Sequence, residues 1–488
     1  MHISSLPCSY GIGTLGKASR NFIDFLKAAG QTYWQVLPIC PTGYGDSPYQ
    51  SFCCEAGNHY FIDLDELCCL GLLEKKDFDD NFWGKDPSRA NYGVLYQRRF
   101  KVLYKAAEKY LESPSGAYKN FLLKNAFWLD DYAVFMTLKC QNGGTPWYEW
   151  EAPLKNRDEE ILKDFCSKNK HDIEIWKAIQ YFFFSQWFAL KDYANKKGIK
   201  IIGDLPIYVA HDSASVWANR NLFKLDEDGM PKLVSGCPPD GFSATGQLWG
   251  NPLYEWDYMK SDGYTWWIRR IDYLCNVFDV LRIDHFRGFE SYYAIPAKGA
   301  TAENGIWEKG PGTELFKAIK KEIGDKDIIA ENLGFLTPAV ENMLKESGFP
   351  GMKLLQFSFD ERDLGGDLCL PHDFEENCVA YIGTHDNDTA LGWLESANPE
   401  NAARAIEYMH LDGYKKEERG WGMLDTLWGT KAKIVIAQAQ DILKLGNEAR
   451  MNVPSKQSGN WVWRALPGSF TPDLALRLRE LTEKYDRL

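Results

Sequence analysis

The chain has 488 residues, a formal net charge of −12 at pH 7 and a pI near 5.3. This acidic balance argues against nucleic acid or an anionic membrane as a partner, and no apolar run approaches the roughly 20 residues of a membrane span. The first residues lack the charged and apolar pattern of a secretion signal, so the 12 cysteines are predicted to be reduced thiols in a cytoplasm.

Aromatic residues are frequent, at 14% of the chain with 18 tryptophans. Their faces are large, rigid and apolar, and most of them must fill the core. Those that remain exposed are suited to stack on sugar rings, which have one apolar face. The composition therefore favours a carbohydrate ligand without requiring one.

Short apolar runs that close on polar residues, glycine or proline recur along the chain, and each predicts a β-strand. Helical patterns lie between several of them, and this alternation indicates a parallel sheet. The predicted strands are 33–39, 200–209, 280–286, 327–333, 352–357 and 379–384, with a last one near 443–452. The spacing is typical of βα repeats, so we predict an α/β fold: one (β/α)8 TIM barrel that takes up residues 1–488.

Two gaps between strands are too long for a single crossover. The first contains the helical patterns 92–110, 118–139 and 172–197, which predict a helical insertion at about 75–195. The second is rich in glycine, proline and aromatic residues and predicts a loop-rich lid over the strand ends at about 210–270. Further helices are predicted at 312–323, 337–347, 471–488 and within 391–440.

Three acidic residues stand at the ends of predicted strands, namely Asp284, Glu331 and Asp386. In a parallel barrel such ends meet on one face, where the chemistry is carried out. Arg282 points to the same side of its strand as Asp284, and we expect it to lower the pKa of that carboxyl. The alternative for this pair is a buried ion pair with a structural role only.

Cleavage of a glycosidic bond needs a carboxylate and a carboxylic acid on either side of the bond. Asp284 is the predicted nucleophile, Glu331 the predicted acid/base, and Asp386 the predicted stabiliser that binds sugar hydroxyls. The apolar Ile329 and Ala330 provide an environment that can raise the pKa of Glu331.

A metal-dependent hydrolase is the alternative chemistry, because His2, His211, His285 and His385 also lie near strand ends. Metal sites need closely spaced imidazoles, and neither an H-x-H nor an HExxH pattern occurs here. We therefore predict no metal. His285 and His385 are interpreted as hydrogen-bond donors to a sugar or as structural histidines.

Eight stretches resemble the 4-alpha-glucanotransferases (amylomaltase or disproportionating enzyme) of the alpha-amylase clan, and the resemblance covers nearly the whole chain. They are HISSLPCSYGIGTLG (2–16), GDSPYQSF (45–52), GDLPIYV (203–209), SATGQLWGNPLY (243–254), RIDHFRG (282–288), AENLG (330–334), GTHDNDT (383–389) and ARMNVP (449–454). Relatives usually carry apolar residues before the first stretch, so we expect a shortened first strand. In the lid, Gly241 stands where the family usually has an aromatic residue, which puts acceptor affinity in doubt.

The resemblance implies the three carboxylate roles given above, a barrel with insertions, and no metal or cofactor. It also implies a set of residues that bind the glucan: Asp204, Tyr49, Arg282, His285, His385, Gln247, Trp249 and Asn452. In the lid, Phe242 and Trp249 are predicted to form apolar walls that exclude water and stack the acceptor. For several of these a structural role is the alternative, a strand-end cap for Asp204 and loop packing for Tyr49 and Trp249.

The function expected from the resemblance is retaining transfer of alpha-1,4-glucan segments between maltodextrins, with release of glucose. The expected partners are maltodextrins, maltose and starch- or glycogen-derived glucans, with oligomeric state left open. Two alternatives remain: an alpha-glucan hydrolase on the same scaffold, and a catalytically inactive barrel that only binds glucans.

Overall fold

The structure is a computed structural model that describes residues 1–43, 45–79, 82–239, 243–334, 336–360, 369–454, 456 and 458–488. Its strands are β1 (Tyr33–Gln35), β2 (Lys200–Leu205), β3 (Leu233–Cys237), β4 (Gln247–Pro252), β5 (Val280–Ile283), β6 (Ser291–Pro296), β7 (Ile306–Lys309), β8 (Ile328–Ala330), β9 (Gly351–Leu354), β10 (Cys378–Tyr381) and β11 (Ile434–Ile436). The helices are α1 (Lys17–Ala28), α2 (Leu64–Cys69), α3 (Tyr92–Leu111), α4 (Gly116–Gln141), α5 (Ala152–Lys155), α6 (Glu159–Lys168), α7 (Lys170–Lys196), α8 (Ala214–Ala218), α9 (Trp256–Ser261), α10 (Thr265–Val277), α11 (Thr313–Ile323), α12 (Pro338–Ser347), α13 (Ala390–Ser396), α14 (Pro399–Tyr408), α15 (Arg419–Trp428), α16 (Ala439–Ile442) and α17 (Pro472–Lys484).

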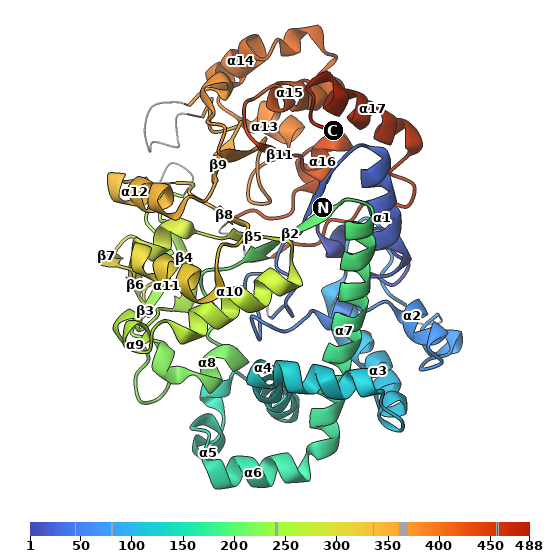
Figure 1. The fold of residues 1–488 in the computed structure, drawn as a ribbon, viewed down its shortest axis with the longest axis vertical. Coiled ribbons are helices and arrows are strands. Elements are labelled where there is room, and N and C mark those ends of the chain that lie inside the picture. Colours follow the sequence, from blue (N-terminus) through green and yellow to red (C-terminus); the bar gives the residue numbers. More distant parts are fainter. Residues whose placement is uncertain are drawn as a thin grey trace.

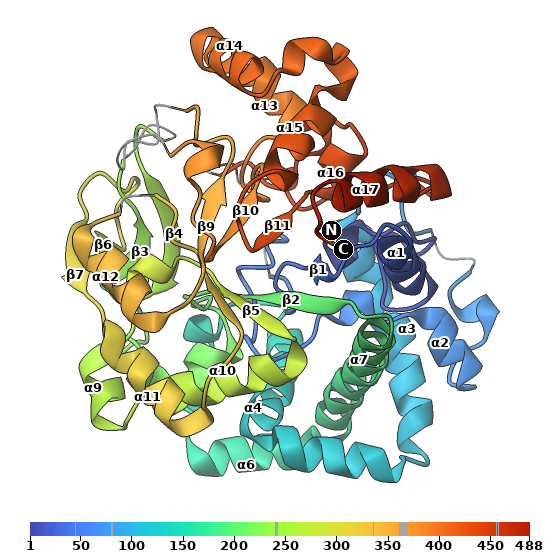
Figure 2. The ribbon, with the colours of Figure 1, turned by 45° about the horizontal axis from the view of Figure 1, so that its top comes forward.

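Parallel strands form two arcs at the centre of the molecule, and helices surround them (Figures 1 and 2). One arc has the order β1-β2-β5-β8 and the other the order β9-β10-β11. The N–H of Ala330 in β8 donates to the carbonyl of Pro350 at 3.0 Å, which joins the arcs at β9. The α/β barrel predicted from the sequence is confirmed.

The barrel interior is built in layers because alternate residues of each strand point inward. One hydrophobic cluster collects inward residues from both arcs: Ile202, Val280, Ile329, Met352, Leu354, Val379 and Tyr381. Two residues further along β2 and β5 the inward positions are Asp204 and Arg282, which are register partners. The apolar layer is therefore followed by a polar layer that includes Asp204 and Arg282, and this polar layer lies next to the carboxyl ends of the strands.

The helices predicted between the first two strands are confirmed as α3, α4 and α7, and α7 packs against both of the others (Figure 1). A second, antiparallel sheet of order β4-β3-β6-β7 was not predicted. Gly236 and a register shift between Val234 and Gly236 interrupt the two-residue alternation in β3. This irregularity hid the strand in a segment expected to be loop-rich.

The prediction of a last strand near 443–452 is wrong. The last parallel strand is β11, inside a segment predicted as helical, and α16 and a short 3-10 helix (Asn447–Ala449) follow it. The alternation of Leu443, Lys444 and Leu445 resembles a strand, but Lys444 has φ +59°, which is incompatible with one.

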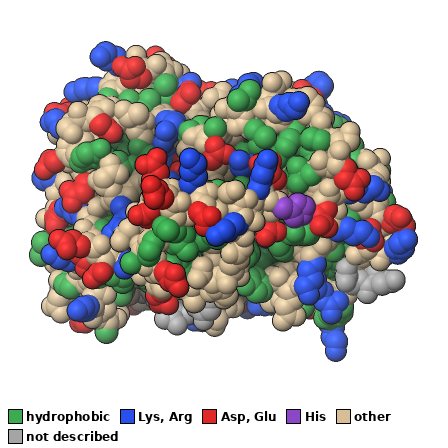
Figure 3. All heavy atoms as spheres, turned by 90° about the horizontal axis from the view of Figure 1, so that it is seen from below, with side chains coloured by type: hydrophobic (Ala, Val, Ile, Leu, Met, Phe, Trp, Pro, Cys, Tyr) green, Lys and Arg blue, Asp and Glu red, His purple; other side chains and the backbone are tan. Residues whose placement is uncertain are grey.

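Cys40, Cys53, Cys54 and Cys378 are buried, free thiols. Among the described residues, no helix is both long and apolar enough to cross a membrane. On the face of the molecule drawn in Figure 3, acidic and basic side chains are interspersed.

Candidate active site

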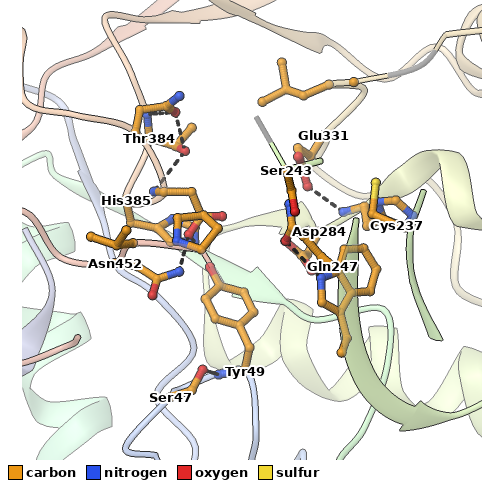
Figure 4. A pocket seen from close by; sticks show the side chains of 18 of the residues that line it. Ser47, Tyr49, Cys237, Ser243, Gln247, Asp284, Glu331, Thr384, His385 and Asn452 are labelled. Carbon is orange, nitrogen blue, oxygen red and sulfur yellow. Dashed lines mark hydrogen bonds and ion pairs between the residues drawn. The ribbon is translucent and has the colours of Figure 1, made fainter. Parts of the chain in front are cut away.

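A cleft of about 710 Å³ lies over the carboxyl ends of the barrel strands, and the three predicted carboxylates line it together. Figure 4 shows Asp284 and Glu331 on one side and His385, Tyr49 and Asn452 on the other. The predicted site residues that line the cleft are Asp284, Glu331, Asp386, Tyr49, Gln247, Trp249, His285, His385 and Asn452. The convergence expected from three strand ends is therefore observed.

The backbone fixes Asp284 and Glu331 against each other just beyond the paired strands. Asp284 N–H donates to the carbonyl of Leu205, and Glu331 N–H donates to the carbonyl of Ile283, both at 3.0 Å. His285 follows with φ 47°, a left-handed conformation that is uncommon for a residue with a side chain. In this conformation its N–H donates to Glu331 Oε2 at 2.6 Å. A strained residue thus orients one of the two carboxyls.

Arg282 lies beneath both carboxyls and is only 3% exposed. Its Nη1 is 2.7 Å from both oxygens of Asp204 and 3.3 Å from Asp284 Oδ1, while its Nη2 is 3.2 Å from Glu331 Oε2. One guanidinium therefore faces three carboxylates. Asp204 is 4% exposed, and neither it nor Arg282 lines the cleft.

Arg282 does act to lower the pKa of Asp284, as expected, but the net shift of that pKa is upward. Burial raises that pKa well above its usual value, and the charge of Glu331 adds to the rise, against the opposing effect of Arg282. Burial also raises the pKa of Glu331, as expected, against the effects of Arg282 and the His285 N–H. Burial is the largest cause of both shifts, and the one nearby cation, Arg282, is shared among three carboxylates and does not offset it.

Asp386 lies across the cleft in a partly exposed loop. Asn452 Nδ2 donates to its Oδ1 at 2.6 Å, and Nε2 of His385 is 3.4 Å from the same oxygen. The ring of Tyr49 stacks on His385 with centroids 5.1 Å apart, and its hydroxyl donates to Asp204 at 2.9 Å. These contacts form one wall around the third carboxylate.

The opposite wall is contributed by β4. The indole of Trp249 meets the ring of His285 edge-on at 4.9 Å, and its Nε1 donates to Gln247 Oε1 at 3.2 Å. Burial lowers the pKa of His285 to about 3, so its ring is neutral. Phe242 and the neighbouring Gly241 lie outside the described residues.

The four histidines weighed as metal ligands do not converge. The His2 ring accepts the N–H of Leu37 at 3.2 Å, and the His211 ring bonds the carbonyl of Gly229 at 2.7 Å. In the part of the chain that the structure describes, no group of three or more His, Cys, Asp or Glu side chains has the geometry to hold a metal ion.

The sequence was compared with those of known proteins. The model of the family described as 4-alpha-glucanotransferase matches residues 1–468, which include the residues of the cleft. The chain belongs to this family. The 4-alpha-glucanotransferase of Clostridium butyricum is 48% identical over the whole of both chains, and that of Thermus thermophilus is 46% identical over all of this chain and 98% of its own. The amylomaltase of Streptococcus agalactiae, solved in complex with acarbose, has a TM-score of 0.96 at 42% identity and covers 100% of this chain and 98% of its own. The enzyme class expected from the sequence is confirmed.

Three residues that line the cleft of this 4-alpha-glucanotransferase were not predicted as site residues from the sequence. Arg450 belongs to the ARMNVP stretch, and its Nε and Nη2 donate to the backbone carbonyls of Asn452 and Asp386 at 2.8 and 2.5 Å. Position in that stretch was the only signal for it. Trp307 on β7 and Arg287 also line the cleft. Nothing in the sequence around Trp307 marked it, because its sheet was not predicted.

Proposed function

We propose that this 4-alpha-glucanotransferase works by a retaining mechanism in which Asp284 is the nucleophile, Glu331 the acid/base and Asp386 the stabiliser of the transition state. The observation that carries the proposal is that one guanidinium, Arg282, contacts both Asp284 and Glu331 at the cleft wall. Retention requires two carboxyl groups about 5 Å apart, on either side of the scissile bond. The shared cation draws one oxygen of each group toward the same guanidinium, which supports a short separation between them.

In the first step an oxygen of Asp284 attacks C1 of a glucosyl unit and the glycosidic C1–O4 bond breaks. Glu331 gives its proton to the departing O4, so the shortened glucan leaves with a neutral hydroxyl. In the second step the 4-hydroxyl of an acceptor gives its proton to Glu331, its oxygen bonds to C1, and the ester to Asp284 breaks. The raised pKa of Glu331 supports its role as the proton donor.

Asp386 is proposed to hold sugar hydroxyls of the unit under attack, with Asn452 and His385 beside it. Asp204 and Arg282 are proposed to act from beneath the cleft as positioning residues, since both are buried and neither lines it. The substrates proposed for this site are maltodextrins and related alpha-1,4-glucans.

The partition between sugar and water separates this proposal from a hydrolase on the same scaffold. An ordered acceptor competes with bulk water because orientation supplies an effective molarity on the order of 10⁵ M or more. Incubation with maltotriose is expected to give glucose and a ladder of longer maltodextrins at nearly constant reducing ends. Reducing ends that climb steadily with no product longer than maltotriose would identify a hydrolase, and no turnover at all would identify a binding protein.

A further inference from the structure

A large aromatic side chain is exposed at the wall of the cleft. Trp307 is 45% exposed and lines the cleft, whereas its neighbour Ile306, at 57% exposed, does not line it. Adjacent strand residues point to opposite faces of the sheet, which accounts for the difference. A large apolar side chain that is exposed at the wall of a cleft is typical of a position that contacts a ligand.

The indole of Trp307 is held in a fixed plane. The guanidinium carbon of Arg287 lies 4.0 Å from the centre of one ring face, and Arg287 is itself buried and donates from Nη2 to Ser291 at 3.1 Å. The ring of Tyr293, the strand partner of Trp307, packs at 5.2 Å and 57°. One face is therefore covered, so the exposed area belongs to the other face and the edge. A ring already fixed in place loses little conformational entropy when a ligand stacks on it.

The position of Trp307 relative to the carboxylates assigns it to one end of the cleft. His385 and Asn452, which contact Asp386, mark the wall proposed to bind the unit under attack. Glu331, the proposed proton donor to the leaving oxygen, lies on the opposite side of the cleft from these two residues (Figure 4). Arg287 follows Asp284 by three residues in the short 3-10 helix Phe286–Phe289, and β7 belongs to the same sheet as the Gln247 and Trp249 wall. Trp307 thus lies on the side where the leaving group departs and the acceptor enters.

We propose that Trp307 is an acceptor subsite that stacks on a glucosyl unit beyond the one whose 4-hydroxyl reacts. This inference rests on the proposed function and adds to it a preference for acceptors longer than one sugar. A sugar ring fits the site chemistry because it has an apolar face for the indole and hydroxyls for the polar cleft. An anionic ligand fits less well, since five carboxylates line the same cleft against three cationic side chains.

The test compares two acceptors in the full-length protein, with maltoheptaose as donor and either labelled glucose or labelled maltotetraose as acceptor. Maltotetraose is long enough to reach past the reacting unit and glucose is not. Trp307→Ala is expected to raise the KM for maltotetraose about tenfold, the effect of one lost aromatic stacking contact, and to leave the KM for glucose within about twofold. Trp307→Phe is expected to recover most of the maltotetraose KM.

Ile306→Ala is the matched control, because it removes a similarly exposed side chain from the same strand on the face that does not line the cleft. It is expected to change neither KM. Equal effects of Trp307→Ala on both acceptors, or none on either, overturn the subsite. A wild-type enzyme that transfers to neither acceptor overturns the proposed function instead, so the two failures are distinguishable.

Discussion

Removal of the Asp204 charge is predicted to shift the pH profile of the enzyme toward acid. Asp204 Oδ1 and Asp284 Oδ1 lie 2.7 and 3.3 Å from the same nitrogen of Arg282, so they are at most about 6 Å apart. At that distance and an effective dielectric constant of about 20, two unit charges repel by about 2.8 kcal/mol, or about two pKa units. Because the Asp284 side chain is 24% exposed, solvent reduces this, and about one to two units is expected.

Asp204→Asn keeps the shape of the side chain and an oxygen that can accept the Tyr49 hydroxyl. It removes a charge that raises the pKa of both Asp284 and Glu331. In the proposed mechanism Glu331 carries the proton that assists the leaving group, so the alkaline limb of kcat/KM should move about one to two units to lower pH. The acid limb should move in the same direction, because Asp284 then stays ionised at lower pH. Glucose release from maltotriose, followed across pH, measures both limbs.

The control is Asp212→Asn, which removes another carboxylate with a buried cationic partner. Asp212 is 2.5 Å from Lys139 and does not line the cleft. Asp212→Asn removes the carboxylate partner of Lys139, whereas Asp204→Asn leaves Arg282 with Asp284 and Glu331 as partners. Only Asp204→Asn should shift the profile. An alkaline limb that stays in place, or moves to higher pH, would refute the view that Asp204 raises the pKa of the catalytic pair.

Three further outcomes follow from the site and its support. Asp284→Asn should fold but lose several orders of magnitude in activity, and more than a few per cent of the wild-type rate would contradict its role as nucleophile. The activity of Glu331→Gln should be partly rescued by a substrate whose leaving group needs no proton. Arg450→Ala should lower kcat about 10²-fold with a smaller change in KM, since it frees the loop of the third carboxylate, and Arg450→Lys should recover part of the loss. Burial raises the pKa of Asp441 to about 7, so the folded state favours the protonated form. The free energy of unfolding should therefore fall as pH rises from about 4 through 7, by at most about 4 kcal/mol. Denaturant unfolding of Asp441→Asn should lack this fall, and parallel curves of stability against pH for the two proteins would exclude it.

The sequence was sufficient for the parts of the site that depend on local alternation. Arg282 and Asp284 are two residues apart and do point the same way, and strand ends did bring Glu331 and Asp386 to the same cleft. The pKa of Asp284 could not be predicted, because it depends on Asp204 and Glu331, which come from neighbouring strands. The spacing of residues along one strand places Arg282 beside Asp284, but it does not show that Asp204 and Glu331 contact the same arginine.

The antiparallel sheet was missed for a related reason. β3 pairs with β6 across more than fifty residues of sequence, and β7 reaches the cleft only through that pairing. Trp307 therefore has no signature in its own neighbourhood. By contrast, α3, α4 and α7 were predicted because helical periodicity is contained within each segment. The features that could not be predicted are those that depend on contacts between segments far apart in the sequence.

The polar layer inside the barrel is best explained by chemistry rather than stability. Buried ion pairs contribute little net stability, and well-packed apolar residues in their place are often neutral or stabilising. Here three carboxylates surround one arginine, so negative charge exceeds positive charge in a buried place, and the pKa values of Asp284 and Glu331 are raised there by burial and by the neighbouring charges. A raised pKa suits the role proposed for Glu331, because each step of the proposed mechanism moves one proton through it. The apolar layer beneath, which includes Val280, provides the packing that offsets the unfavourable burial above it.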